Sequence, residues 1–594
     1  MRVYNTFFLI LLLSLFTVIS CKKFTGSKLV PITDKPFEQE INGEIDPIAS
    51  PDARKGGVIS LWGSGFPRSL NYWLDQNGVS GEIMGLLFEP LAELHVTENK
   101  MVGILADSWT ISPDKKTFVF KIRPDAAWSD GKPVVAEDFQ FFYDVIMNKK
   151  YLTTVFRVEL ARLERPEVID SKTVKIRAKG KHWSNFDTAA GLIAFPKHLW
   201  EKKDFNKVHF QFPVVSGPYR VREVKKNRYV LLQRNGDWWG RAKKYNKNKY
   251  NFDYIRFRFI SDRDKALESF KKGNLDIYPI YTASIWAKKT NFEEVQKNWV
   301  VRQRIFNRQP RGFQGFTINM RRPIFQDIRV RKALCYLLNR KSMNDKFMYN
   351  EYFLLNSYYP DLHPDNKNPS APFYEYNPVK ARELLRQAGW NVGAEGILEK
   401  NGEQFEIKFL SAAEEKRHLE LYLSDLKSVG IKATIDQTSW ATASKRLDEH
   451  DYDLYWVAWG AGRLRDPEPS WHSATADEKA SNNLSGVKDA AVDRLVEQQK
   501  TEFSLDRRND ILQKLDTRLN AIIPYVLLWQ IDHTRILYWN RFGRPAHVLG
   551  KYSNESSVLL YWWFDENRKS ALEGAMKNGE AMPAEPDRIE YRGP

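Results

Sequence analysis

Alternating and periodic apolar positions predict strands and helices along most of this chain. In residues 117–122, the apolar Phe118, Phe120 and Ile122 alternate with Thr, Val and Lys, which is typical of a β-strand. The segment VISLWG (58–63) is a second strand candidate, and the pattern from Ala136 onward is helical. Strands and helices thus follow one another from an early point in the sequence.

The clearest predicted helix begins at Asn377-Pro378, where Asn is a suitable N-cap and Pro a suitable first-turn residue. Gly389 predicts its end. Two further apolar helix faces lie in 330–338 and in 511–522, and Pro524 stops the second. Strand-like segments at 405–410 and 454–459 fall between these helices. This mixture predicts lobes of the α/β class.

The N-terminus departs from this pattern, because Phe7 to Ile19 is almost entirely apolar and follows the basic Arg2. A run of this length predicts a secretory signal peptide over residues 1–20. Val18-Ile19-Ser20-Cys21 resembles a bacterial lipobox, so Cys21 is the predicted lipidation site. The alternative is an ordinary signal peptide that happens to contain a cysteine. Residues 21–51 are predicted to be a lipidated N-terminus with a flexible tether, and 566–594 a loose polar tail.

Composition limits the class of protein. With 594 residues and 42% hydrophobic content, the chain can fold into several packed regions. The net charge of +17 comes from mixed signs without a basic tail, which favours a solvated basic surface over nucleic-acid binding. Two cysteines exclude Cys₄ zinc modules and disulfide scaffolds. With Cys21 lipidated, Cys335 has no partner and is expected to be a packed side chain.

Enzyme and metal signatures are missing from the sequence. It contains no H-E-x-x-H, P-loop or G-x-S-x-G motif, and its ten histidines have no ligand spacing. We therefore expect no catalytic residue, no metal site and no cofactor. Aromatic residues are abundant, with 19 Trp and 26 Tyr, and many flank Gly and Pro in predicted loops, as between Trp456 and Trp471. Such clusters suit a ligand pocket between lobes.

Six segments in order resemble the bacterial family 5 extracellular solute-binding proteins, the oligopeptide and dipeptide type. They are DSWTISPDKKTFVFKIRPDAAWSDGKPVVAEDF (107–139), SGPYRV (216–221), QRNGDWWG (233–240), GNLDIYPI (273–280), FQDIRVRKALCYLLNRKSM (325–343) and NPVKARELLRQAGW (377–390). A C-terminal run, WHSATADEKASNNLSG with RILYWNRFGRP, is similar to the branch linked to long-peptide and microcin uptake.

The resemblance implies a two-lobe periplasmic binding protein, class II-like and of cluster C, with an inserted third domain. It implies a monomer that delivers oligopeptides to the permease and ATPase subunits of an ABC importer. The expected location is the periplasmic space, with the protein anchored through Cys21 to a membrane that the sequence does not specify. The implied boundaries are 52–80, 212–308 and 527–565 for lobe I, 81–211 for the inserted domain and 309–526 for lobe II. The lobes would be joined near Gly312–Asn319 and Pro524–His533.

The segment LYWVAWGAGRLRDPEPSW (454–471) is the most informative for a ligand. Apolar residues on both faces predict a buried strand, and ligands of α/β sheets lie beyond the carboxyl end of such strands. In the family, the matching Trp lines the pocket and an acid three residues later holds the ligand's free amine. Here that position is Gly462. The candidate ligand-binding residues are Trp459, Gly460, Gly462, Arg463, Arg465 and Asp466.

Two interpretations of this altered anchor stay open. Either Asp466 substitutes for the missing acid, or the ligand is held through its backbone, an aromatic wall at Trp459 and the arginines Arg463 and Arg465. For the two arginines, a solvated loop is the alternative. Alternative ligands are a cell-wall peptide, a glycan or a metal chelate. Alternative classes are an exported hydrolase and a structural protein that binds the anionic wall.

Overall fold

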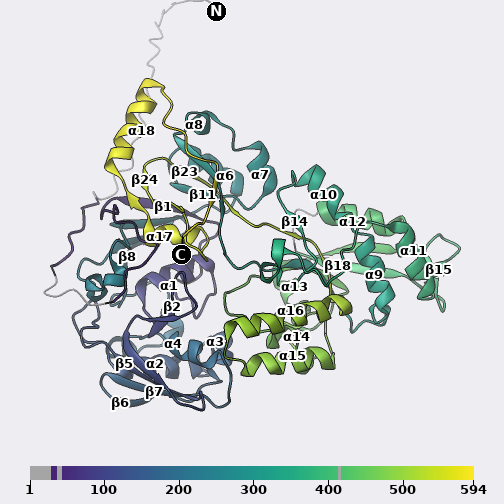
Figure 1. The fold of residues 1–594 in the computed structure, drawn as a ribbon, viewed down its shortest axis with the longest axis horizontal. Helices are drawn as coiled ribbons and strands as arrows, with labels where there is room; N and C mark the ends of the chain where they lie inside the picture. Colours follow the sequence, from purple (N-terminus) through teal and green to yellow (C-terminus); the bar gives the residue numbers. More distant parts are fainter. Residues whose placement is uncertain (1–28, 37–42, 413–416, 594) are drawn as a thin grey trace, which may run out of the picture.

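The computed structural model describes residues 29–36, 43–412 and 417–593. The predicted signal peptide and Cys21 lie outside the described residues. Figure 1 shows two lobes: one contains both ends of the described chain, and the other is built from its middle. This is the predicted α/β, two-lobe architecture.

Two four-stranded sheets form lobe I. One has the order β1-β10-β9-β8, with β1 and β10 parallel; its strands are β1 (Val58–Gly63), β10 (Tyr254–Phe259), β9 (Tyr229–Arg234) and β8 (Tyr219–Lys225). The other has the order β11-β23-β12-β26; its strands are β11 (Ile277–Pro279), β23 (Thr534–Trp539), β12 (Val300–Phe306) and β26 (Arg588–Glu590). Lobe I therefore joins segments from distant parts of the sequence.

The predicted loose tail after Asp565 is wrong. Residues Glu566–Asn578 form helix α18, whose N-cap Asp565 accepts hydrogen bonds from two backbone N–H groups of the first turn. Strand β26 pairs in parallel with β12. Leu572 and Met582 are buried in a hydrophobic cluster of lobe I. A few buried side chains thus hold a segment in which most other residues face solvent.

The predicted tether is also wrong over the residues of 21–51 that the structure describes. Asp46 and Lys249 form an ion pair of 3.0 Å, and both side chains are almost fully buried. Arg234 pairs with Asp34, and Ile48 is part of the hydrophobic core. The polar composition suggested a solvated coil, whereas Asp34 and Asp46 have buried partners in lobe I.

The inserted domain contains an antiparallel sheet with the order β4-β5-β7-β6. Its strands are β4 (Ala106–Ile111), β5 (Thr117–Ile122), β7 (Thr173–Arg177) and β6 (Glu167–Asp170). The strand pattern at 117–122 is confirmed, because Phe118, Phe120 and Ile122 are buried. Helix α2 (Ala136–Met147) confirms the predicted helix. Ile59 of β1 and Phe120 lie in one continuous hydrophobic cluster, so this domain and lobe I share a core.

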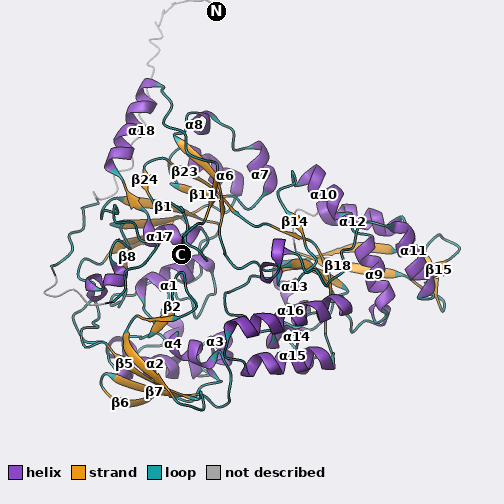
Figure 2. Cartoon of the chain, in the orientation of Figure 1, coloured by secondary structure: helices purple, strands orange, loops and turns teal. Residues whose placement is uncertain are grey.

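Lobe II is built on a five-stranded sheet with helices on both faces (Figure 2). The strand order is β19 (Lys432–Gln437), β18 (Glu406–Ser411), β20 (Leu454–Ala458), β13 (Gln314–Ile318) and β21 (Tyr525–Leu527). One face packs against α9 (Ile328–Tyr336), α11 (Pro378–Gln387) and α12 (Arg417–Lys427). The other packs against α15 (Ala490–Thr501) and α16 (Leu505–Ile522). The three predicted helices are confirmed, including the Asn377 cap and the positive φ of Gly389.

Two chain crossings join the lobes. The first lies between β12 and β13, at 307–313, and the second between β22 (Trp529–Gln530) and β23, at 531–533. The second crossing is later than the expected lobe boundary at 526/527, because β21 and β22 still pair with strands of lobe II. At Gly312 a Cβ would lie 1.7 Å from the carbonyl oxygen of Trp459, so the close approach of these backbones requires glycine there.

Within the described ranges, none of the helices combines the length and the apolar character needed to cross a membrane.

Candidate ligand-binding site

A cavity of about 910 Å³ lies between the lobes, next to the crossings. Lobe I contributes residues such as Tyr281 and Lys288, and lobe II contributes Phe316 and Trp456. Arg311 lines the cavity from the first crossing. A ligand in this cavity would contact both lobes at once.

Strand β20 presents an incomplete edge to this cavity. Its partner β13 pairs with it from Leu454 to Ala458, whereas β18 pairs only with Leu454 and Tyr455. No described strand covers the other edge of β20 beyond Tyr455. Trp456, at the start of this stretch, is 42% exposed and donates from its indole Nε1 to Gln314 Oε1 at 3.2 Å. The site therefore combines main-chain groups that can accept a further strand with an aromatic wall.

Polar groups at the second crossing form the floor of the cavity. His533 and Arg535 are both at least nine-tenths buried. His533 Nε2 lies 3.5 Å, and Arg535 Nη1 3.6 Å, from Glu351 Oε2, which is an ion-pair distance but too long for a hydrogen bond. Arg535 Nη2 donates to the Tyr281 carbonyl at 3.1 Å and lies 3.3 Å from the hydroxyl of Tyr352. Because Glu351 and Tyr352 belong to lobe II, this floor ties the two lobes together.

Charge around the cavity is strongly positive. Over the residues that the structure describes, its lining contains six Arg and Lys side chains and one carboxylate, Glu555. Burial lowers the pKa of the Arg311 guanidinium, while the nearby Asp532 and Asp361 act in the opposite direction. A desolvated cation of this kind favours an anionic partner.

Trp459 does not line this cavity. Alternation along β20 places it on the face opposite Trp456, where it packs in the cluster that contains Phe313 and Tyr525. Its indole Nε1 lies 3.1 Å from the Tyr525 hydroxyl. The sequence analysis missed Trp456, although the period of two along the strand already separates these two tryptophans by face.

The predicted loop residues contact other parts of the protein instead of the cavity. Arg463 crosses to the inserted domain and donates to the His95 carbonyl at 2.6 Å and to Asn99 Oδ1 at 2.8 Å. Arg465 pairs with Asp361 at 2.5 Å, within lobe II. The glycines Gly460 and Gly462 are exposed in the same loop.

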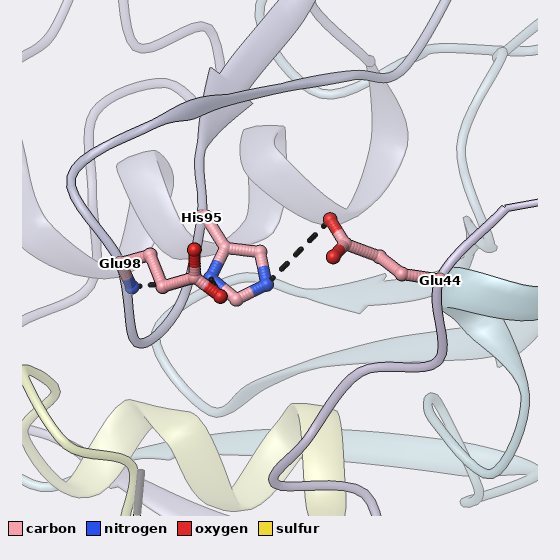
Figure 3. Close-up of side chains that lie close together, drawn as sticks. All are labelled: Glu44, His95 and Glu98. Carbon is pink, nitrogen blue, oxygen red and sulfur yellow. Dashed lines mark hydrogen bonds and ion pairs between the residues drawn. The ribbon is translucent and has the colours of Figure 1, made fainter.

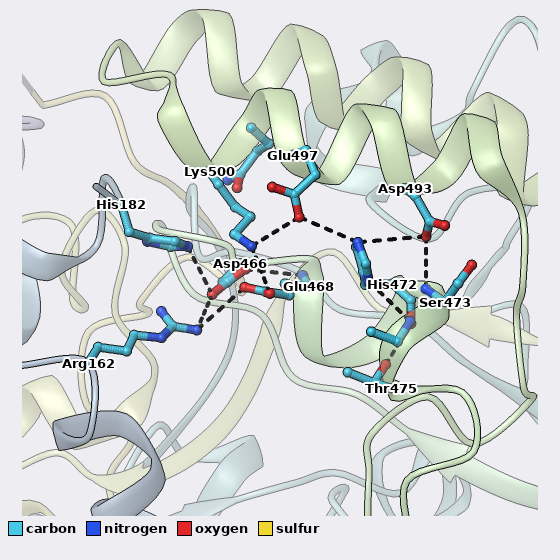
Figure 4. A network of polar contacts seen from close by, with 12 residues as sticks. Arg162, His182, Asp466, Glu468, His472, Ser473, Thr475, Asp493, Glu497 and Lys500 are labelled. Carbon is cyan, nitrogen blue, oxygen red and sulfur yellow. Dashed lines mark hydrogen bonds and ion pairs between the residues drawn. The ribbon is translucent and has the colours of Figure 1, made fainter. Parts of the chain in front are cut away.

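Asp466 also faces the inserted domain. Its Oδ2 atom lies 3.0 Å from Arg162 Nη2 and 3.6 Å from His182 Nε2 (Figure 4). Nearby, the Trp183 indole Nε1 donates to Gln499 Oε1 at 3.0 Å. The loop 460–466 is therefore part of an interface between lobe II and the inserted domain, separate from the two crossings.

Among the described residues, two clusters of histidine and carboxylate side chains have ligand atoms close enough for a metal: Glu44, His95 and Glu98 (Figure 3), and His182, Asp466 and Glu468 (Figure 4). In both, the histidine Nδ1 accepts a backbone N–H, from Glu98 at 3.1 Å and from Ser184 at 3.1 Å respectively. A neutral imidazole with an accepting Nδ1 carries its proton on Nε2. Neither nitrogen then has a free lone pair for a metal. The carboxylates of the first cluster pair with Lys100 and those of the second with Arg162, so both clusters are explained without a metal.

Two lobes that enclose a cavity and are joined by two crossings define the fold of a bilobal solute-binding protein. The model of the bacterial extracellular solute-binding proteins, family 5, matches residues 100–482, and the chain belongs to this family. The probable peptide-binding protein YejA of Agrobacterium fabrum is 27% identical over 546 residues, covering 84% of this chain and 88% of YejA. The peptidoglycan-binding protein YepA of the same organism is 25% identical, covering 84% and 89%.

Solved structures have the same fold. The oligopeptide-binding protein AppA from Bacillus subtilis, in complex with a nonapeptide, matches with a TM-score of 0.70 at 20% identity, over 86% of this chain and 100% of AppA. NikA from Brucella suis, in complex with Fe(III)-EDTA, matches with a TM-score of 0.68 at 19% identity, over 82% and 96%. These neighbours bind chemically different ligands, so fold alone does not identify the solute.

Proposed function

We propose that this protein captures oligopeptides in the cavity between its lobes and delivers them to an ABC importer. The observation that carries this proposal is the open edge of β20 beside Trp456. An extended peptide can pair its main chain with such an edge, which gives affinity that does not depend on side chains. The relative YejA, described as a probable peptide-binding protein, supports the same ligand class.

Capture would proceed by closure of the lobes. A ligand shifts an equilibrium between open and closed forms only through contacts that differ between them. A peptide on the β20 edge that also touches Tyr281 or Lys288 of lobe I makes such contacts. The loop 460–466 would then support closure through the inserted domain rather than hold the ligand amine.

Ligand-induced stabilisation tests this function. A ligand that binds only the native state stabilises it by about 2.7 kcal/mol at a hundredfold excess over Kd. A mixed oligopeptide library is expected to raise the melting temperature of the purified protein and to shrink its scattering radius. If glycans or metal chelates produce both effects while peptides of every length produce neither, the ligand class is wrong.

Cell-wall peptides are the second candidate ligand, because the relative YepA is described as peptidoglycan-binding. Soluble fragments of peptidoglycan, with and without the glycan part, are the additional arms of the same melting experiment. Stabilisation by these fragments alone would favour the second candidate over general oligopeptides.

We also propose that Cys21 carries a lipid anchor. Lipidation contributes about 0.8 kcal/mol per buried CH₂, so more than one acyl chain holds a protein firmly on a membrane. The Cys21→Ser variant is expected to move from the membrane fraction to the soluble envelope fraction with an unchanged melting temperature. A wild-type protein that is wholly soluble after envelope extraction would contradict the anchor.

A further inference from the structure

The cavity between the lobes carries an excess of positive charge that a neutral peptide would leave uncompensated. Among the described residues, its lining cations are Arg263, Lys288, Arg311, Lys346, Arg417 and Arg535, and its lining carboxylate is Glu555. Glu555 is itself engaged, because it accepts a hydrogen bond from the Tyr281 hydroxyl.

Several of these cations contact carbonyls or rings and have no carboxylate partner in the part of the chain that the structure describes. Arg311 donates to the Asp532 carbonyl at 3.1 Å, and no carboxylate of a described residue lies within 4.0 Å of its guanidinium. The Arg417 guanidinium lies 4.1 Å from the centre of the Phe347 ring. Lys288 of lobe I lies over Tyr349 of lobe II at 5.5 Å. Outside the cavity, by contrast, Arg465 and Arg446 each have a carboxylate partner.

The buried floor already has a carboxylate of its own. Arg535 Nη1 and His533 Nε2 make no hydrogen bond within the described part of the chain, but they lie 3.6 and 3.5 Å from Glu351 Oε2. Charge-assisted bonds to a ligand oxygen are therefore left to the cations of the cavity walls.

Closure of an empty cavity brings like charges toward one another. Lys288 and Arg535 belong to lobe I, whereas Lys346 and Arg417 belong to lobe II. Like charges across a closing cleft repel each other, and this repulsion is strongest where water is excluded. A bound anion is attracted to the cations of both lobes, so it replaces their repulsion with attraction. An anionic ligand is therefore expected to favour the closed form more than a neutral ligand does.

We propose that the preferred ligands are acidic peptides, whose carboxylates are received by Arg311 at the crossing and by Arg417 and Lys346 of lobe II. This inference rests on the proposed peptide-binding function and adds a selectivity to it. Arginine can hold a carboxylate through two parallel hydrogen bonds, which makes recognition geometric as well as electrostatic. Both an acidic side chain and the C-terminal carboxylate offer this chemistry.

Calorimetry on full-length processed protein tests the selectivity. Tetrapeptides of equal length are compared: Ala-Ala-Ala-Ala, Ala-Glu-Ala-Glu and Ala-Gln-Ala-Gln, each with a free and an amidated C-terminus. The Glu peptide is expected to bind at least tenfold more tightly than the Gln peptide, and raising the salt concentration from 0.05 to 0.5 M is expected to narrow the difference. If only amidation lowers the affinity, the cations bind the C-terminal carboxylate of the peptide. If only the exchange of Glu for Gln lowers the affinity, they bind its acidic side chains.

Variants connect this preference to the residues. Arg417→Gln and Lys346→Gln are each expected to weaken binding of the Glu peptide by about tenfold. The affinity for the Gln peptide is expected to stay nearly unchanged. Arg311→Gln is compared with Arg311→Lys, which keeps the charge at the crossing. The control variant is Arg386→Gln, at an exposed position of α11 that does not line the cavity. It removes the same charge and is expected to leave the affinity for both peptides unchanged.

The outcomes separate the two proposals. If the neutral peptides bind as tightly as the acidic one, the acidic preference is wrong while peptide binding stands. If Arg386→Gln acts like Arg417→Gln, the preference reflects overall charge, and the assigned residues are wrong. If none of the peptides binds, both the proposed function and this inference are overturned.

Discussion

At the scale of single residues, Trp456 and Trp459 have different environments although they lie three residues apart: Trp456 lines the cavity and Trp459 packs inside lobe II. Both are large apolar residues near the end of β20, yet one lies against a cavity and the other within a packed aromatic cluster. Their spacing of three residues places them on opposite faces of the sheet. Residue type alone therefore does not identify the ligand wall.

The Trp456→Ala variant is expected to weaken binding of all peptides by about 1–3 kcal/mol, because a bound peptide would cover the exposed part of this ring. Trp459→Phe keeps a ring in its cluster and loses only the contact with the Tyr525 hydroxyl, so it is expected to lower stability slightly and to leave affinity unchanged. Calorimetry and urea unfolding on both variants measure the two effects. A larger loss of affinity in Trp459→Phe would restore Trp459 as the ligand wall.

At the scale of elements, the buried ion pair between Asp46 and Lys249 holds the N-terminal segment 43–51 to lobe I. Lys249→Met would leave Asp46 buried without its partner, and breaking such a pair costs about 3–5 kcal/mol. The double variant Asp46→Leu with Lys249→Met is expected to recover much of this loss, because no unpaired charge remains. The free energy of unfolding in urea measures both.

The matched control is Lys35→Met, which removes the exposed pair between Lys35 and Asp237. Exposed pairs contribute about 0–1 kcal/mol, so this variant is expected to unfold nearly like wild type. Equal effects of Lys35→Met and Lys249→Met would show that burial does not distinguish the two pairs.

Elements with local signals could be predicted from the sequence. The helix at 378–387 has its cap, first-turn proline and terminal glycine within about a dozen residues, and the strand at 117–122 has its period of two. The segments 43–51 and 566–593 could not, because their order depends on partners far along the chain, such as Lys249 and strand β12. Composition shows that these segments are polar, but it does not identify the distant residues with which their polar groups pair.

The features of the candidate site likewise divide into those that the sequence predicts and those that depend on tertiary arrangement. Local patterning predicted a strand at 454–459, and the structure has it at Leu454–Ala458. The sequence could not show that β18 stops pairing after Tyr455, nor that Arg463 reaches the inserted domain, because both depend on tertiary arrangement. The cavity cations Arg311 and Arg417 lie in separate segments without a shared motif, so no pattern connects them before folding.

At the scale of the whole molecule, the interface between lobe II and the inserted domain is expected to respond to pH. His182 Nδ1 accepts the backbone N–H of Ser184 and can do so only while that nitrogen is unprotonated. Burial lowers the pKa of His182 below its ordinary value of 6.5; Asp466 and Glu468 raise it, and Arg162 and Lys500 lower it further. The neutral form is thus favoured in the folded protein.

The sign of the effect follows from this direction. Because the folded pKa lies below the unfolded one, the unfolded state binds more protons between the two values. The contribution of His182 to stability is therefore complete above about pH 6.5 and falls as the pH decreases through that value toward the folded pKa. Wild type is expected to lose unfolding free energy between pH 7.5 and 5 more steeply than His182→Asn, whose amide oxygen can still accept the Ser184 N–H.

The exposed His209 provides the control, because His209→Asn removes an imidazole away from this interface. It is expected to keep the wild-type slope, since the carboxylates that titrate over the same range are unchanged. If peptide-induced closure uses the interface of Asp466 with the inserted domain, the affinity of wild type for peptide should also fall in acid more than that of His182→Asn. Identical pH slopes for wild type and His182→Asn, in both unfolding and binding, would show that His182 does not couple this interface to pH or to ligand binding.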